Sequence, residues 1–135
     1  MAGAAEQNKK IALDFIETGF NQGRPADAAE RYIGETYTQH NPMVEDGVEG
    51  FLTFATTWKR NFPNLRIDFK RIVADGDLVI VHSLLTGVAM PGDEGLDDPS
   101  YALVDVLRLE DGKIREHWDV IQRVPDQALH SSSMV

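Results

Sequence analysis

The segment Tyr101-Ala-Leu-Val-Asp-Val-Leu-Arg-Leu-Glu-Asp-Gly-Lys-Ile-Arg-Glu-His-Trp-Asp-Val-Ile-Gln122 decides the fold, because it predicts two β-strands joined by a tight turn. Alternation along the first strand places Asp105 on the face that also carries Tyr101, Leu103, Leu107 and Leu109. A carboxylate therefore interrupts a row that would otherwise face the core. Because burying an unpaired carboxylate is costly, Asp105 is a candidate functional group.

The register of this hairpin determines which ionisable side chains meet. A two-residue turn at Asp111–Gly112 would send His117 and Asp119 to the face opposite Asp105. A three-residue loop at Glu110–Gly112 would instead place Asp105 directly across from His117, with Asp119 as its diagonal neighbour. We predict the three-residue loop, because it gathers the three ionisable groups in one place.

Composition and charge restrict the classes of function. The 135 residues, 42% of them hydrophobic, predict a single domain over residues 1–135, with a core at about 5–124 and a loose tail at 125–135. The chain has no cysteine, which excludes disulfides, cysteine-based zinc sites and a thiol nucleophile. A formal charge of -9 argues against nucleic acid or an anionic membrane as a partner, since both bind clusters of Lys and Arg.

Targeting and membrane signals are not recognisable in the sequence. Met1–Glu6 does not show the basic and then apolar order of a secretory signal. No apolar run approaches the roughly 18 residues that a membrane helix needs. We therefore expect a cytoplasmic protein without a membrane partner.

The order of predicted elements is helices first and strands later. Apolar residues at helical spacing predict helices over residues 5–20 and 25–33, and an aromatic stripe predicts a third over 51–62, which Pro63 ends. Alternation then predicts strands over 65–73 and 78–90, and residues 91–100 form a polar loop before the hairpin. This order predicts an α+β fold, with three N-terminal helices covering one face of a curved, mostly antiparallel sheet.

A pocket between the helices and the sheet would collect the polar side chains that stand in apolar surroundings. The candidates are His40, Asn41, His82, Asp105, His117 and Asp119. His40 and Asn41 lie in the segment 37–42, which we predict to be a loop at the pocket mouth. Two carboxylates close together in such a pocket do not both ionise easily, so one of them should have a raised pKa. That arrangement suits proton transfer next to a carbonyl group.

The same residues allow other interpretations. A non-catalytic ligand-binding or dimerisation module would hold Asp105 and Asp119 in ion pairs with arginines. A hydrolase or dehydratase would use the two carboxylates to activate water. A zinc or iron site could use His40, His82, His117 and the two carboxylates, but no His-x-His or His-Glu-x-x-His spacing supports it, and we predict no metal.

A family resemblance rests on three motifs. The early helical segment, Gln39-His-Asn-Pro42 with Asp46-Gly47, and Val104-Asp-Val-Leu-Arg-Leu-Glu-Asp-Gly-Lys-Ile-Arg-Glu-His-Trp-Asp119 together resemble the SnoaL-like polyketide cyclases of the nuclear transport factor 2-like superfamily. The resemblance spans about residues 5–124. It implies a cone-shaped roll of three helices on a strongly curved sheet, a central pocket, and a homodimer formed through the outer sheet face.

The resemblance also implies a chemistry. Cyclases of this group use an aspartate near the end of the last strand as general acid/base in an intramolecular aldol ring closure without a cofactor, and Asp119 matches it. Asn41 matches the Asn of the family's Asn-Pro loop. Asp105 stands where those cyclases have a His, so the partner of the acid/base differs here and His117 takes part of that role.

These observations lead to one functional hypothesis. We expect a cofactor-independent enzyme, of the cyclase or isomerase type, that acts by proton transfer on a small, largely apolar molecule containing a carbonyl group. Asp119 would be the base, tuned by His117 and Asp105. Polar side chains would orient the substrate oxygen and aromatic ones would form the apolar wall; these are His40, Asn41, His82, Phe51, Phe54 and Trp58.

Overall fold

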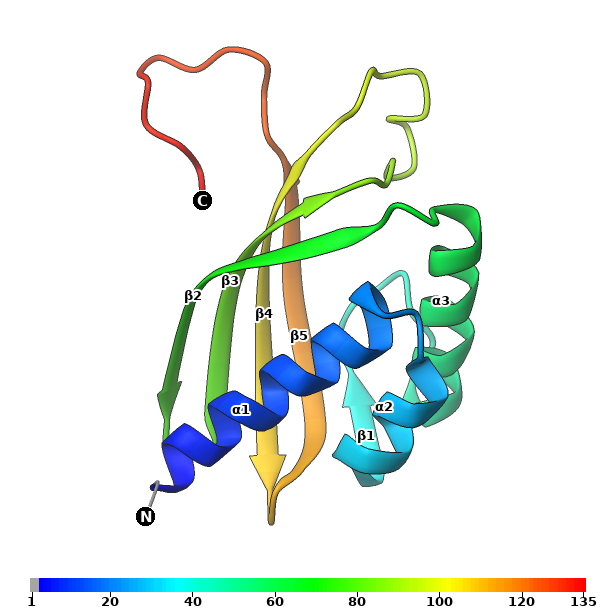
Figure 1. The fold of residues 1–135 in the computed structure, drawn as a ribbon, viewed down its shortest axis with the longest axis vertical. Coiled ribbons are helices and arrows are strands. Elements are labelled where there is room, and N and C mark those ends of the chain that lie inside the picture. The colour runs from blue at the N-terminus through cyan, green and yellow to red at the C-terminus, as the bar shows by residue number, and fades with distance from the viewer. Residues whose placement is uncertain (1–2) are drawn as a thin grey trace.

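Three helices and a five-stranded sheet make up the fold (Figure 1). The computed structural model describes residues 3–135. Met1 and Ala2 lie outside the described residues, so part of the Met1–Glu6 segment discussed above is not described. The elements in chain order are α1 (Ala4–Ile16), the π-helical turn η1 (Glu17–Asn21), α2 (Pro25–Tyr32), β1 (Ile33–Gln39), α3 (Gly47–Asn61), β2 (Arg66–Asp75), β3 (Leu78–Thr86), β4 (Tyr101–Glu110) and β5 (Lys113–Arg123). The predicted α+β class is confirmed.

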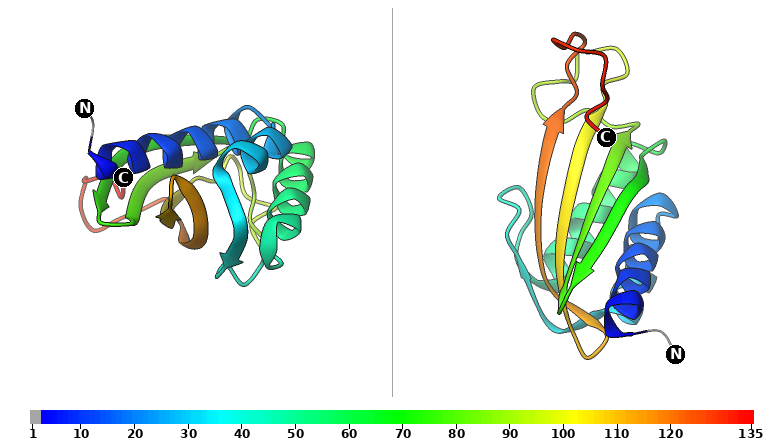
Figure 2. Two further views of the ribbon diagram at one scale, coloured as in Figure 1. Left: turned by 90° about the horizontal axis from the view of Figure 1, so that it is seen from below. Right: turned by 90° about the vertical axis from the view of Figure 1, so that its left-hand side faces the viewer.

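The strands form one mixed sheet in the order β1-β5-β4-β3-β2. Strand β1 runs parallel to β5, and every other neighbouring pair is antiparallel. The sheet bends strongly, and the helices gather on its concave face (Figure 2). Helix α1 crosses β2 and β3, while α3 lies beside β1. The concave face between these helices and β4 and β5 is where a pocket can form.

The hairpin between β4 and β5 differs from the predicted register. Leu109 pairs with Ile114, so the turn contains two residues, Asp111 and Gly112, and the predicted three-residue loop is wrong. Both turn residues have positive φ, 52° and 73°. This is the type I′ geometry that matches the twist of the flanking strands, and Asp-Gly is one of its preferred sequences.

A β-bulge restores the grouping of polar side chains that this turn alone would have separated. Leu109 pairs with Ile114 but Arg108 pairs with Glu116, so Arg115 is an extra residue in β5. One extra residue reverses the alternation of the strand beyond it. As a result Asp105 lies directly opposite Asp119, rather than opposite His117 as predicted. All three side chains still share the concave face.

Strand β1 was not predicted. Ile33 was assigned to the second helix and residues 37–39 to a loop, whereas Ile33–Gln39 is a strand that pairs with β5. Helix α2 begins with Pro25 at its first turn, as predicted, but ends at Tyr32. Gly34 permits the strand to lie here, because a Cβ atom at this position would stand 2.7 Å from Cδ of Arg115. The partner strand that makes β1 favourable is far away in the sequence.

Helix α3 is confirmed with its aromatic stripe, but it begins at Gly47, before the predicted start at Phe51. The Asp46 side chain caps it by accepting hydrogen bonds from the backbone N–H groups of Gly47, at 2.9 Å, and Gln39, at 2.7 Å. The aromatic stripe faces inward, with Phe51 buried and its ring centroid 5.0 Å from that of Phe15 on α1. The helix ends at Asn61, before Pro63. The capping residue therefore ties α3 to β1 as well as starting it.

The chain continues past β5 without regular structure. Residues 124–135 contain no helix or strand and leave the end of β5 beside the loop before β4 (Figure 1). Within residues 3–135, every helix is too short or too polar to cross a membrane.

Candidate functional site

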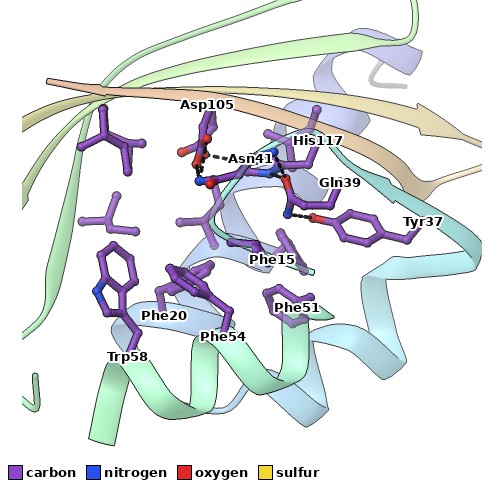
Figure 3. A pocket seen from close by; sticks show the side chains of 17 residues that line it. Phe15, Phe20, Tyr37, Gln39, Asn41, Phe51, Phe54, Trp58, Asp105 and His117 are labelled. Atoms are coloured by element: carbon purple, nitrogen blue, oxygen red, sulfur yellow. Dashed lines mark hydrogen bonds and ion pairs between the residues drawn. The ribbon is translucent and has the colours of Figure 1, made fainter. Parts of the chain in front are cut away.

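A cavity opens between the concave face of the sheet and the helices (Figure 3). It encloses about 580 Å³ of space between atoms, counted out to its mouth, and the centres of water molecules can occupy about 40 Å³ of it. Most of the wall is apolar, and the polar side chains come from β1, β4, β5 and the segment after β1. The lining residues are Phe15, Ile16, Phe20, Tyr37, Gln39, Asn41, Val44, Phe51, Phe54, Trp58, Ile67, Leu103, Asp105, Leu107, His117, Asp119 and Ile121.

Asp119 is held in the cavity by Asn41. The Nδ2 group of Asn41 donates to both carboxylate oxygens, at 2.9 and 3.0 Å. The orientation of this amide is determined by the backbone, because the N–H of Met43 can only donate and it lies 2.8 Å from Asn41 Oδ1. Asn41 thus connects the turn at Pro42 to the last strand, and it holds the carboxylate in one orientation.

Asp105 and His117 form a buried pair beside Asp119. Asp105 is only 6% exposed, and its Oδ1 lies 2.7 Å from Nε2 of His117. Asp105, His117 and Asp119 each bring a carboxylate oxygen or ring nitrogen within 4.8 Å of the others. No arginine or lysine contacts either carboxylate within residues 3–135. The ion pairs expected for a purely structural pair of aspartates are therefore not formed in the described chain.

Gln39 determines the protonation pattern of His117. The backbone N–H of Asn41 donates to Gln39 Oε1 at 3.0 Å, which identifies that atom as the oxygen of the amide. The same oxygen lies 2.8 Å from Nδ1 of His117, so Nδ1 carries a proton and donates it. The remaining proton of the pair then lies between His117 Nε2 and Asp105. His117 and Asp105 share one proton, so the pair is neutral overall, and the position of that proton decides only whether it consists of imidazolium and carboxylate or of imidazole and carboxylic acid.

Electrostatics favour an imidazolium beside two carboxylates. Burial lowers the pKa of His117, but its hydrogen bond to Asp105 and the charges of Asp105 and Asp119 outweigh burial, so the pKa lies above its ordinary value of 6.5. Desolvation raises the pKa of Asp119 above its ordinary 3.8; the His117 charge and the Asn41 hydrogen bond oppose this rise, and the Asp105 charge adds to it. Asp119 is therefore a stronger base than an ordinary aspartate.

Tyr37 supplies a neutral hydroxyl to the same cavity. Its ring is buried, and its Oη accepts a hydrogen bond from Gln39 Nε2 at 3.1 Å. Desolvation, with the charges of Asp105 and Asp119, raises its pKa well above the ordinary value of 10.0. The phenol therefore stays protonated, and within residues 3–135 its O–H has no acceptor. Such a group can donate a hydrogen bond to a ligand oxygen.

Two of the predicted site residues do not reach the cavity. His40 follows the cavity-facing Gln39 and points to the opposite face, where its ring stacks on Trp118 at 4.6 Å and its Nε2 lies 2.7 Å from Glu116. His82 alternates with the buried Val81 and contacts Arg71 on that same outer side. The prediction that these histidines line the pocket is corrected, because strand alternation places their side chains outside.

The fold places the other predicted site residues around the cavity. Asn41, Asp105, His117 and Asp119 form the polar part of the wall, and Phe51, Phe54 and Trp58 belong to its apolar part. Tyr37 and Gln39 also line the cavity, which was not predicted, because the sequence pattern of their segment favoured a loop. Their signal was the spacing of Tyr37 and Gln39, two residues apart, which puts both on one face of a strand.

Asp105, His117 and Asp119 are also the side chains that could hold a metal ion. However, Nδ1 of His117 is used by Gln39, and Nε2 lies at hydrogen-bonding distance from Asp105. A cation bound there would have to replace the shared proton and move these two groups apart. The geometry in the structure is that of a proton-sharing pair.

One known protein family matches most of this chain. The family described as SnoaL-like polyketide cyclase matches residues 10–127. No curated protein sequence matches the chain at a significant level.

Solved structures show the same fold at low sequence identity. TsrD from Streptomyces laurentii is 22% identical with a TM-score of 0.74, over 90% of this chain and 91% of that one. A putative polyketide cyclase from Acidithiobacillus ferrooxidans is 23% identical with a TM-score of 0.71 over the same shares. AclR, a putative hydroxylase from Streptomyces galilaeus, is 23% identical with a TM-score of 0.72, over 88% and 91%. With the family match over most of its length, this chain belongs to the SnoaL-like polyketide cyclase family.

Proposed function

We propose that the protein is a cofactor-independent enzyme that removes a proton from carbon next to a carbonyl group in a small, largely apolar molecule. The observation that carries this proposal is the position of Asp119, a carboxylate with a raised pKa at an apolar cavity wall, held by Asn41 and, among the residues that the structure describes, near no basic group but His117. Such a base is matched to weakly acidic C–H bonds better than an exposed aspartate is.

Each polar group has a role in this proposal. Asp119 accepts the proton, and the cluster then changes from a net charge of -1 to neutral, because the imidazolium of His117 already balances one carboxylate. Gln39 keeps His117 in the orientation that shares a proton with Asp105. Tyr37 donates its O–H to the substrate oxygen, where negative charge develops. The enolate formed can then close a ring or be reprotonated, so cyclase and isomerase reactions both start from this step.

Homodimer formation through the outer sheet face belongs to the same proposal. The face opposite the cavity carries exposed apolar side chains, among them Val73 at 56%, Ile80 at 40% and Val120 at 69% exposure. Scattered exposed apolar residues are ordinary, but a row of them on one sheet face is typical of an interface. A second copy would cover this row without blocking the cavity.

The proposal is tested by hydrogen exchange, which needs no knowledge of the natural substrate. Simple ketones, such as octan-2-one, are incubated with the protein in D₂O, and loss of the α-hydrogen signals is followed by NMR. We expect Asp119→Asn to slow the protein-dependent exchange by roughly 10²- to 10⁴-fold, the usual contribution of a general base. The fold should persist, because asparagine has the same shape and can still accept from Asn41.

The matched control is Asp111→Asn in the turn of the same hairpin. Asparagine tolerates the positive φ of 52° at this position, and the turn lies at the far end of β4 and β5 from Asp119. The control should exchange at the rate of the unchanged protein. Treatment with a chelator should also leave the rate unchanged. Exchange that persists in folded Asp119→Asn protein, or that disappears with the chelator, would contradict the proposal.

A further inference from the structure

An outer groove continues the cavity beyond its mouth. The groove and the cavity share four lining residues, Asn41, Phe54, Trp58 and Ile121. Asn41 also binds Asp119, so one side chain touches both compartments. Ile121 is the next inward-facing residue after Asp119 on β5, about 7 Å along the strand. A molecule whose end reaches Asp119 therefore extends directly into the groove.

The two compartments enclose comparable space between atoms, about 580 and 750 Å³ including their open mouths, but the cavity is much narrower. Measured by the space open to the centres of water molecules, the groove offers about 300 Å³ and the cavity about 40 Å³. The cavity space suffices for a few water molecules, each of which needs roughly 10–15 Å³ in this measure. Only a slender group fits beside Asp119 without displacing the aromatic wall. The bulk of a ligand has room in the groove. A second hollow of about 290 Å³ beside α3 also adjoins the cavity, but only the groove shares with the cavity Asn41, which binds Asp119, and Ile121, the next inward-facing residue on β5.

The groove wall is apolar and held in place. Beyond the shared residues it consists chiefly of Met43, Phe62, Met90 and Pro91, with Glu94 at its edge. Tyr101 anchors the loop that carries Met90: its Oη accepts from the Met90 backbone N–H at 2.9 Å and donates to Asp93 Oδ2 at 2.7 Å. The wall is thus pre-formed, so binding there does not have to order a loop first.

Charge excludes one class of ligand. Within residues 3–135, no lysine or arginine lines the cavity or the groove, whereas Asp105, Asp119 and Glu94 do. The whole chain carries a formal charge of -9. An anionic ligand would meet like charges and find no unpaired cation among the described lining residues, because the imidazolium of His117 is already bound to Asp105.

We infer that the groove between the C-terminal half of α3 and the 89–94 loop is a subsite for the uncharged apolar tail of a ligand that enters end-on, with its slender carbonyl end beside Asp119. This inference rests on the proposed function only for what happens at the carbonyl end. The occupant is a small-molecule tail because the groove is continuous with the cavity and shares its lining.

The test measures binding and not turnover. Trp58 lines both compartments and Trp118 lies on the outer sheet face, so Trp118→Phe leaves Trp58 as the single tryptophan of the chain and a reporter of the mouth. Butan-2-one, hexan-2-one and octan-2-one are titrated, with octanoate as the anionic probe of matched length. We expect each added methylene to tighten binding about fourfold, the value for a fully buried methylene, and octanoate to bind at least about tenfold more weakly than octan-2-one.

A matched pair of variants locates the tail. Met43 lines both the groove and the second hollow beside α3 and is 56% exposed, while Leu96 is 44% exposed in the neighbouring loop and lines none of the three compartments. Both therefore accept aspartate without unfolding the protein. Met43→Asp should weaken octan-2-one binding roughly 15-fold, the worth of two buried methylenes, and leave butan-2-one nearly unchanged. Leu96→Asp should change neither.

The possible outcomes separate this inference from the proposed function. Length-dependent binding that persists in Asp119→Asn supports the subsite, whether or not hydrogen exchange is lost. Affinity that does not rise with chain length overturns the subsite, as does an equal effect of Met43→Asp on all three ketones. Ketone binding that improves when the protein is diluted also overturns it, because a second copy of the chain would then occupy the groove. If Trp118→Phe does not fold, calorimetry on the unchanged protein gives the same series.

Discussion

Replacing His117 by leucine should lower the free energy of unfolding by about 3–5 kcal/mol, because it leaves Asp105 buried without its partner. Asp105 is 6% exposed, and His117 is its hydrogen-bond partner in the described chain. The other contact of His117 contributes little to this loss, since Gln39 Oε1 still accepts from the backbone N–H of Asn41. The loss of unfolding free energy therefore comes from the buried carboxylate of Asp105, which has no partner left.

This loss of unfolding free energy corresponds to a fall in melting temperature. For a chain of this length, 1 kcal/mol corresponds to roughly 3–4 °C, so His117→Leu should melt about 10–20 °C below the unchanged protein. The double variant Asp105→Leu/His117→Leu replaces the ionic pair by apolar side chains in an apolar wall. Such replacements are often neutral or stabilising, so the double variant should recover most of the loss.

The assay is urea unfolding at pH 7, followed by circular dichroism, on the two single variants and the double variant. The coupling free energy from this cycle measures the pair itself. A double variant as unstable as His117→Leu alone would show that the loss comes from packing. A cost below 1 kcal/mol for His117→Leu would show that Asp105 is not held by this pair.

Further predictions concern pH, the outer face and one glycine. The raised pKa of His117 stabilises the folded protein fully below pH 6.5, and this stabilisation should be lost as pH rises through the folded-state pKa. Urea titrations across this pH range should show the loss of stability. The pH dependence should be smaller in Asp105→Asn. The rate of ketone hydrogen exchange should fall as pH falls through the raised pKa of Asp119. Asn41→Ala removes a hydrogen-bond donor to this carboxylate, so the fall in rate should occur at higher pH in this variant. Val120→Lys should halve the mass in sedimentation if the outer face forms a dimer, with unchanged circular dichroism; an unchanged mass would place the interface elsewhere. Gly50→Ala should prevent stable folding, because its Cβ would overlap the carbonyl group of Glu45, whereas Gly95→Ala meets nothing within 4 Å and should melt normally.

Local patterns along the chain determined the elements that depend on near neighbours. The aromatic stripe specifies α3, Pro25 specifies the start of α2, and alternation specifies the strands of the hairpin. The same alternation marked Asp105 as a carboxylate on a core-facing row. These signals are readable because helix and strand periodicity act over a few residues.

The tertiary structure decided what depends on distant partners. Strand β1 exists because β5 lies beside it, and this partner brings Tyr37 and Gln39 into the cavity while turning His40 outward. The register of the hairpin depends on one bulged residue, Arg115, and no propensity marks its position.

The amino-acid sequence by itself therefore determined the fold class, the family and the two carboxylates of the site. Only the folded chain decided which side chains surround them, because a single extra residue in a strand reverses every face beyond it, and because pairing between distant segments is a property of the whole sheet.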